Sequence, residues 1–210
     1  MVSILKFNHC KPQGIFCFNI PPVCPVCKGN LSSLRSPPVA IPTPFINGVK
    51  RPCSVVVKPT VGSFLRDYKS GSNLHTGVTD SKGCVHNYDE EGIHTDTDST
   101  TWEQSLAIPI VDLVDEVLKD IWDERLCNMI SEPNWQIDRY HPDLHNCFDF
   151  VINFLNCVQF NNWKVKCNEP ITKSQFSTEY IVPATSKAAR YISLYRSIER
   201  YGPVIQQQLG

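Results

Sequence analysis

A cysteine at the expected start of a buried helix is the residue best placed for covalent chemistry. Cys147 follows Asn146 and opens residues 147–160, in which apolar side chains cover much of the helix circumference. Free backbone N–H groups and the helix dipole at this end stabilise an anion and lower the pKa of a thiol. We therefore expect Cys147 to be poised as a thiolate, with its own backbone N–H and a donor from Asn146 or His145 available to stabilise an oxyanion.

Two histidines lie in the clearest hairpin of the chain. Segments 74–79 and 84–88 carry His75 and His86, and a polar connection that ends in glycine joins them. With a loop of two or four residues, Gly77 lies opposite His86 and both histidines share one face, whereas a loop of three residues turns one of them to the opposite face. If the helix that begins with the cysteine packs on this face, the side chains form a nucleophile, a base and an orienting group.

The N-terminal residues 1–53 contain half of a zinc ribbon or knuckle. Cys24-Pro25-Val26-Cys27 holds two thiols on a tight turn and is followed within two residues by glycine. The preferred ligand set for a structural zinc ion is Cys10, Cys24, Cys27 and Cys53, and His9 is able to replace one member. Such an ion would explain how a proline-rich module with a small core is ordered.

Strands and helices that carry these residues follow one another along the chain. Segments rich in strand-forming residues and bounded by turn residues come first, at 54–57, 63–68, 74–79 and 84–88, and an acidic loop follows at 89–101. Segments with helical periodicity come next, at 110–130 and 147–160, and Thr185 or Ser186 caps a last helix that Gly202 ends. This order predicts an α+β fold in which helices cover one face of an antiparallel sheet. We expect a Pro/Cys-rich module at 1–53 and an α+β domain at 54–210.

Composition and charge exclude several classes of protein. The chain has 210 residues, and its 20 Lys and Arg balance 21 Asp and Glu, so no nucleic-acid partner is expected. No run of about 18 apolar residues occurs, and the first residues do not form a secretory signal. We therefore expect a protein of the cytosol or nucleus without a transmembrane segment, in which the ten cysteines are core residues, metal ligands or nucleophiles.

The histidine hairpin and the cysteine helix together resemble a known superfamily. The segments LHTGVTDSKGCVHNY and HNCFDFV are similar to those of the circularly permuted papain-like proteins typified by lecithin retinol acyltransferase. The resemblance implies a permuted papain-like fold and a thiol-dependent hydrolase or acyltransferase, with Cys147 as nucleophile, His75 as general base and His86 as the orienting residue. Those enzymes usually have an aromatic residue after the first histidine, where this chain has Thr76. The alternative is a non-catalytic protein-interaction module on the same fold. The substrate of the first hypothesis and the protein partner of the second are both unidentified.

Over its whole length the chain resembles the makorin-2 opposite strand protein family. The motifs that carry this resemblance are KFNHC, CPVC, TPFING, GSFLRDY, LHTGVT, HNC and SLYRSI. This second resemblance brings no activity with it, so the functional expectation rests on the thiol and histidine residues.

Overall fold

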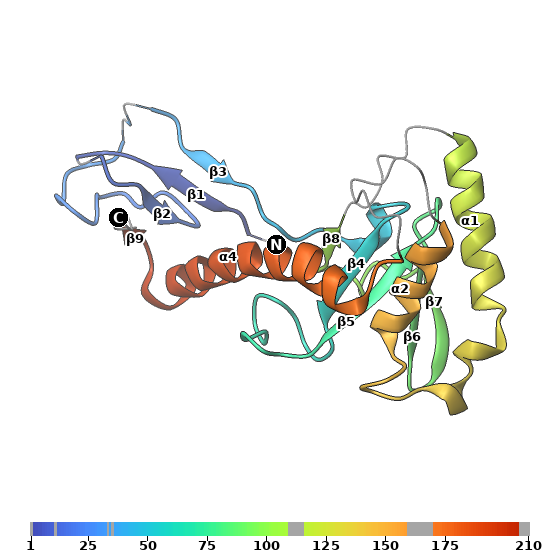
Figure 1. Cartoon of the computed structure of the whole chain (residues 1–210). Helices are drawn as coiled ribbons and strands as arrows, with labels where there is room; N and C mark the ends of the chain where they lie inside the picture. The colour runs from blue at the N-terminus through green and yellow to red at the C-terminus, as the bar shows by residue number, and fades with distance from the viewer. Residues whose placement is uncertain are drawn as a thin grey trace. The chain divides into compact units, whose positions relative to one another are not determined.

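The chain folds into two compact units, each built on an antiparallel sheet. The computed structural model describes residues 2–10, 12–32, 34, 36–108, 116–158 and 170–205. The first unit comprises Met1–Pro44 and Ala189–Gly210, and the second comprises Phe45–Ala188 (Figure 1). Both sheets are accompanied by helices, which confirms the predicted α+β class.

The first unit contains a four-stranded sheet in the order β3-β1-β2-β9. Its strands are β1 (Ile4–Phe7), β2 (Ile15–Cys17), β3 (Val39–Ile41) and β9 (Val204–Ile205). Buried side chains of the strands and of the loop after β2 form one small cluster: Phe7, Ile15, Cys17, Cys24 and Leu31. A module with so small a cluster usually gains stability from a bound metal or from disulfides.

The boundary between the units differs from the one expected at residue 53. Residues 45–53 belong to the second unit, where the Gly48 N–H, in the short helix η1 (Gly48–Lys50), donates to the Trp102 carbonyl oxygen at 2.9 Å. The C-terminal part of the last helix belongs to the first unit, where the rings of Phe18 and Tyr195 lie 4.8 Å apart. The sequence pattern missed both features because they are contacts between distant segments.

The second unit contains a five-stranded sheet in the order β7-β6-β5-β4-β8. Its strands are β4 (Val55–Pro59), β5 (Leu74–Thr79), β6 (Val85–Asp89), β7 (Gly92–Asp96) and β8 (Leu106–Ile108). Val56, Val85 and Trp102 form a buried cluster with this sheet. Three of the four predicted strand segments are therefore present, and β7 lies within the acidic segment that was expected to be a loop.

The fourth predicted strand, at 63–68, is wrong. These residues form turns, in which the Asp67 N–H donates to the Ser63 carbonyl oxygen at 2.9 Å. The Ser63 N–H in turn donates to Asp67 Oδ2 at 2.7 Å. Short polar side chains that bond to nearby backbone groups offer the chain an alternative to strand pairing, and here that alternative prevails.

Two longer helices of the second unit follow its sheet along the chain. α1 (Glu116–Ile130) is followed by the short helices η2 (Pro133–Trp135) and η3 (Ile137–Arg139), and then by α2 (Cys147–Val158). α2 packs against β5, β6 and α1, which makes it the central helix of the unit (Figure 1). Both helices were expected; residues 110–115 and 159–160 of the predicted ranges lie outside the described residues.

The last helical segment begins earlier than expected. α3 (Lys173–Phe176), the π-helical η4 (Ser177–Ile181) and α4 (Val182–Tyr201) follow without a break. Thr172 and Gln175 form a reciprocal capping box at its start. Thr185 does not cap the helix, because its hydroxyl donates to the Ile181 carbonyl oxygen at 2.8 Å. The predicted end is confirmed, since Gly202 adopts a φ of +76° after the last turn.

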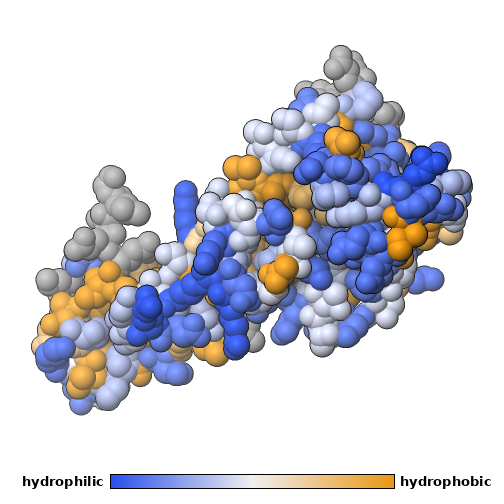
Figure 2. Space-filling view, turned by 90° about the horizontal axis from the view of Figure 1, so that it is seen from below, coloured by the Kyte–Doolittle hydropathy of each residue, from blue (hydrophilic) through white to orange (hydrophobic). Residues whose placement is uncertain are grey.

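None of the described helices combines the length and the apolar character that a membrane crossing requires. Figure 2 shows a face of the molecule on which hydrophilic side chains prevail and apolar side chains gather in separate patches.

Candidate functional site

The register of the β5–β6 hairpin places the two candidate histidines on opposite faces. Thr79 pairs with Val85 and Val78 pairs with His86, so the connection contains the five residues 80–84. With an odd number of loop residues, His75 and His86 point to opposite faces of the sheet, whereas a loop of two or four residues would place them on the same face. The expectation that His75 and His86 share one face is therefore wrong.

Asp80 is the physical cause of the longer connection. Its N–H donates to the Cys84 carbonyl oxygen at 3.0 Å, and its Oδ1 accepts from the N–H groups of Lys82 and Cys84 at 2.9 and 2.8 Å. Gly83 completes the turn with a φ of +90°, which an L side chain rarely adopts. These bonds close the loop around one side chain, and Cys84 becomes part of the turn instead of the strand.

His86 makes its contacts on its own face. Its Nδ1 lies 3.1 Å from Thr95 Oγ1, and its Nε2 lies 3.6 Å from Asp80 Oδ2. The orienting role that the resemblance implied for His86 has no counterpart in these contacts, because neither of them reaches His75.

Asn87 contacts His75 instead. His75 Nε2 and Asn87 Oδ1 lie 2.8 Å apart, and the Asn87 side chain is buried. Gly77 pairs directly with Asn87 and leaves the space through which the two longer side chains meet as diagonal neighbours. Sequence analysis missed Asn87; the alternation of side chains along the hairpin would have found it if the loop length had been known.

Cys147 is the first residue of α2, as expected. Asn146 caps the helix, because its Oδ1 accepts from the Phe148 N–H at 2.9 Å. Asp149 completes the reciprocal cap by accepting from the Asn146 N–H at 2.9 Å, and its Oδ2 also lies 2.7 Å from Lys173 Nζ. These contacts fix the start of the helix at the cysteine.

Cys147, His75 and Asn87 line one cleft of about 600 Å³ in the second unit. The other walls come from β4, from β6 and β7, and from the loop that precedes α2. Tyr140 of that loop also lines the cleft, and burial raises the pKa of its phenol. The predicted nucleophile and the predicted base therefore line the same cleft, and Asn87, not His86, bonds to His75.

Burial favours the neutral forms of Cys147 and His75. Burial raises the pKa of the Cys147 thiol to about 11, although the backbone N–H groups of Thr76 and Phe148 favour the thiolate. Burial also lowers the pKa of His75, against the opposing effect of its hydrogen bond to Asn87. Burial therefore opposes the expected resting thiolate, because the effect of desolvation on the pKa is larger than that of the backbone N–H groups at the helix N-terminus.

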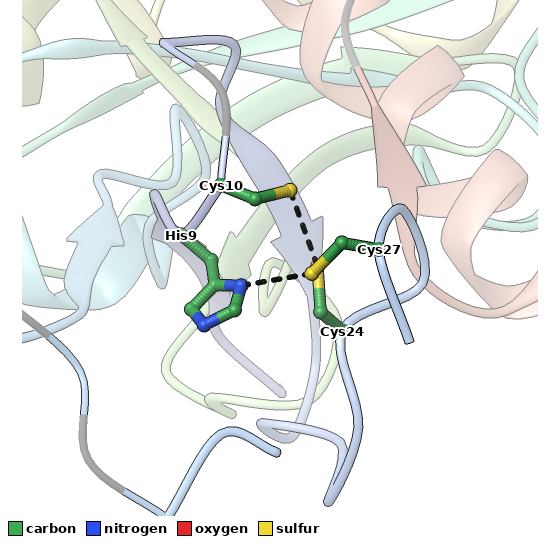
Figure 3. Close-up of side chains that lie close together, drawn as sticks. All are labelled: His9, Cys10, Cys24 and Cys27. Carbon is green, nitrogen blue, oxygen red and sulfur yellow. Dashed lines mark hydrogen bonds between the residues drawn. The ribbon is translucent and has the colours of Figure 1, made fainter. Parts of the chain in front are cut away.

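A second group of side chains in the first unit could hold a metal ion. One nitrogen of His9 and the sulfurs of Cys10, Cys24 and Cys27 all lie within 4.8 Å of one another, and Figure 3 shows them converging from the strand end and the facing turn. The turn is closed by the Cys24 N–H, which donates to the Gly29 carbonyl oxygen at 2.8 Å. Burial opposes ionisation of Cys24, but the N–H groups of Cys27 and Val26 and nearby side chains lower its pKa to about 6.

Cys53 is not part of this group, although it was in the preferred ligand set. It lies in the second unit, where its N–H donates to the Asp80 carbonyl oxygen at 3.1 Å and burial raises the pKa of its thiol to about 12. His9, which the sequence offered as a replacement, stands with the other three residues. A sequence pattern shows ligand types and spacing, but not which of several isolated ligands the chain brings back to the turn.

Comparison with known proteins identifies the family. The family models described as DUF4796 N-terminal and DUF4796 C-terminal match residues 2–31 and 38–198. The human MKRN2 opposite strand protein is 36% identical over 202 residues, which cover 95% of this chain and 87% of the relative. The chain belongs to the makorin-2 opposite strand, or DUF4796, family. This membership confirms the whole-chain resemblance. No solved structure matches the chain, and the likeness of this family member to papain-like enzymes stays a prediction.

Proposed function

We propose that the cleft is the active site of a thiol-dependent hydrolase or acyltransferase. Cys147 is the nucleophile, His75 is the general base and Asn87 orients the imidazole ring. The observation that carries the proposal is the 2.8 Å hydrogen bond between His75 Nε2 and Asn87 Oδ1 in the cleft that Cys147 also lines. A nucleophile, a base and a group that holds the base are the parts that covalent acyl transfer needs.

Because burial favours the neutral forms of both groups, the proposed chemistry is general-base catalysis. His75 Nδ1 takes the proton from Cys147 as the sulfur attacks a carbonyl carbon, and the imidazolium then gives that proton to the leaving group. The C–S bond of a thioester forms and the bond to the leaving group breaks; water or an acceptor hydroxyl or amine later cleaves the thioester. The backbone N–H groups of Thr76 and Phe148, which interact with the sulfur, stabilise its developing charge.

A permuted papain-like arrangement is the fold interpretation that suits this chemistry. It is supported by a cysteine at the N-terminus of a central helix, by an antiparallel sheet that carries the histidine and by the histidine-before-cysteine order. The departure from the implied residues is Asn87, which takes the orienting position given to His86.

The rate of Cys147 alkylation tests the catalytic pair. The full-length chain is treated with iodoacetamide under reducing conditions over a range of pH, and mass spectrometry identifies the modified cysteine. If His75 acts as base, the rate rises as His75 loses its proton below about pH 6.5 and then stays level. His75→Ala should slow alkylation about tenfold at neutral pH, and acetyl-Cys147 should form from 4-nitrophenyl acetate only when His75 is present.

His94→Ala is the matched control for this experiment. His94 lines the same cleft, but its Nε2 bonds to Asp89 Oδ1 at 2.8 Å and not to the proposed residues. Its removal should leave the alkylation rate within about twofold of the wild-type rate. Equal rates in the wild type and in His75→Ala, both rising only toward pH 11, would contradict the proposal and favour the non-catalytic interaction module.

We also propose a structural zinc ion in the first unit, held by His9, Cys10, Cys24 and Cys27. In a tetrahedral zinc site two sulfurs lie about 3.8 Å apart, and a sulfur and a nitrogen lie about 3.5 Å apart. Cys10 Sγ and Cys24 Sγ lie 3.9 Å apart, and Cys27 Sγ and His9 Nδ1 lie 3.4 Å apart. Three sulfurs and one imidazole nitrogen also form a donor set that suits zinc.

Elemental analysis of protein purified without chelators tests the zinc proposal. We expect about one zinc ion per chain, and far less in Cys24→Ser. Cys17→Ser is the control, because Cys17 is buried in the same cluster but lies outside the ligand group. Removal of the ion should increase amide exchange in β1 and β2 and leave β4 to β6 protected. Zinc well below one per chain, or unchanged in Cys24→Ser, would remove the proposal.

A further inference from the structure

One carboxylate of β7 accepts hydrogen bonds from two residues that contact His75. Asp96 Oδ2 accepts a hydrogen bond from Asn87 Nδ2 at 3.0 Å and another from Trp102 Nε1 at 2.8 Å. Asn87 bonds to His75, and the ring of Trp102 lies 5.7 Å from the ring of His75 at an interplanar angle of 33°. Trp102 is fully buried, so the carboxylate anchors a side chain that has no freedom to move into solvent.

The contact with Asp96 determines how the Asn87 amide is oriented. An ionised carboxylate only accepts hydrogen bonds, so the amide must turn its NH₂ group toward Asp96. Its carbonyl oxygen then faces His75, at the observed 2.8 Å from Nε2. A carbonyl oxygen also only accepts, so Nε2 must carry the imidazole proton and Nδ1 must carry the lone pair.

We propose that Asp96 is a positioning residue that fixes the tautomer and the ring orientation of His75. It acts through Asn87 and Trp102 and keeps Nδ1 unprotonated, as a general base requires. The proposed base role of His75 belongs to the function proposed above, but the tautomer itself is a property of the resting protein. Asp96 therefore has a readout that does not depend on turnover.

Three variants separate the hydrogen-bond role of Asp96 from its charge. Asp96→Leu removes the acceptor. Asp96→Asn removes the charge but keeps one carbonyl oxygen, which can accept from the same two donors. Asp89→Asn is the control, because Asp89 is a carboxylate of the same cleft whose contacts are with His94 and the Glu91 N–H.

The first measurement is the imidazole tautomer, from nitrogen NMR of the ¹⁵N-histidine-labelled full chain. The signals of His75 are assigned by their loss in His75→Ala. We expect protonated Nε2 in the wild type, in Asp96→Asn and in Asp89→Asn, and a mixture of tautomers in Asp96→Leu. Protonated Nδ1 in the wild type would overturn the proposal, and this result does not require any Asp96 variant to fold.

The second measurement is the alkylation rate of Cys147 in the same proteins. We expect Asp96→Leu to react about tenfold more slowly than the wild type, and Asp96→Asn and Asp89→Asn to stay within about twofold. An unchanged tautomer and an unchanged rate in a folded Asp96→Leu would overturn the positioning role. If the tautomer of His75 depends on Asp96 but the alkylation rate of Cys147 does not depend on His75, the positioning role stands and the proposed function is refuted.

Discussion

Asn87 supplies the hydrogen-bond acceptor for His75 Nε2, and this contact determines which residues form the candidate site. The sequence offered His86 as the third member, because the expected register placed both histidines on one face and the resemblance implied an orienting residue there. Burial raises the pKa of Cys147 to about 11 and lowers that of His75. Burial therefore favours the neutral forms of both groups, which the residue types could not show.

We predict that Cys147 makes stability depend on pH in the alkaline range. The thiol has an ordinary pKa of 9.0 and a folded-state pKa of about 11. Its contribution to stability is therefore complete below pH 9 and is lost as the pH rises through about 11, because the unfolded chain ionises first. The free energy of unfolding should fall by about 2 to 3 kcal/mol over this range on account of this group.

Urea unfolding followed by tryptophan fluorescence measures this effect, because Trp102, Trp122 and Trp135 all lie in the second unit. Cys147→Ala is the comparison. It should lack this part of the pH dependence, while Cys53, whose pKa burial raises to about 12, titrates in both proteins. Equal pH dependence in the wild type and in Cys147→Ala would show that Cys147 ionises at its ordinary pKa.

At the scale of elements, the start of α2 was predictable and the register of the hairpin was not. Asn146, Cys147 and Asp149 form a local pattern, since a capping residue and its reciprocal acceptor lie within one turn of each other. The register of the hairpin depends on a turn that includes Cys84, whereas the sequence pattern placed Cys84 in the second strand. Strand identity follows from local composition, whereas pairing depends on how a loop satisfies its own polar groups.

We predict that the cap at Asn146 stabilises α2. Asn146→Ala removes the acceptor of the Phe148 N–H and should lower the free energy of unfolding by about 1 kcal/mol. Asn146→Ser keeps a capping oxygen and should recover most of this loss, although it also lacks the amide that donates to the Pro142 carbonyl oxygen. Urea unfolding of the three proteins gives the comparison. Equal destabilisation by both substitutions would assign the effect to the Pro142 contact and not to the cap.

At the scale of the whole molecule, the chain returns to its first unit after completing the second. The pairing of β9 with β2 places Val204 opposite Phe16. No local sequence pattern in either segment predicts this contact. The two units therefore differ from the expected division at residue 53, because the first unit ends at Pro44 and also includes Ala189–Gly210. Each unit contains its own candidate site, the Cys/His cluster in the first and the cleft lined by Cys147 in the second.

The sequence by itself determined the α+β class, the hairpin strands, the helix that Cys147 begins and the presence of candidate metal ligands around Cys24-Pro25-Val26-Cys27. Each of these depends on periodicity, capping or short spacing, which residues within a few positions of one another specify. Only the tertiary structure decided that Asn87 and not His86 bonds to His75, and that His9 and not Cys53 joins the cysteine group. It also decided that Cys147 is buried, which raises the pKa of its thiol to about 11. Those outcomes depend on loop closure, on pairing between distant segments and on burial, and these are properties of the folded chain as a whole.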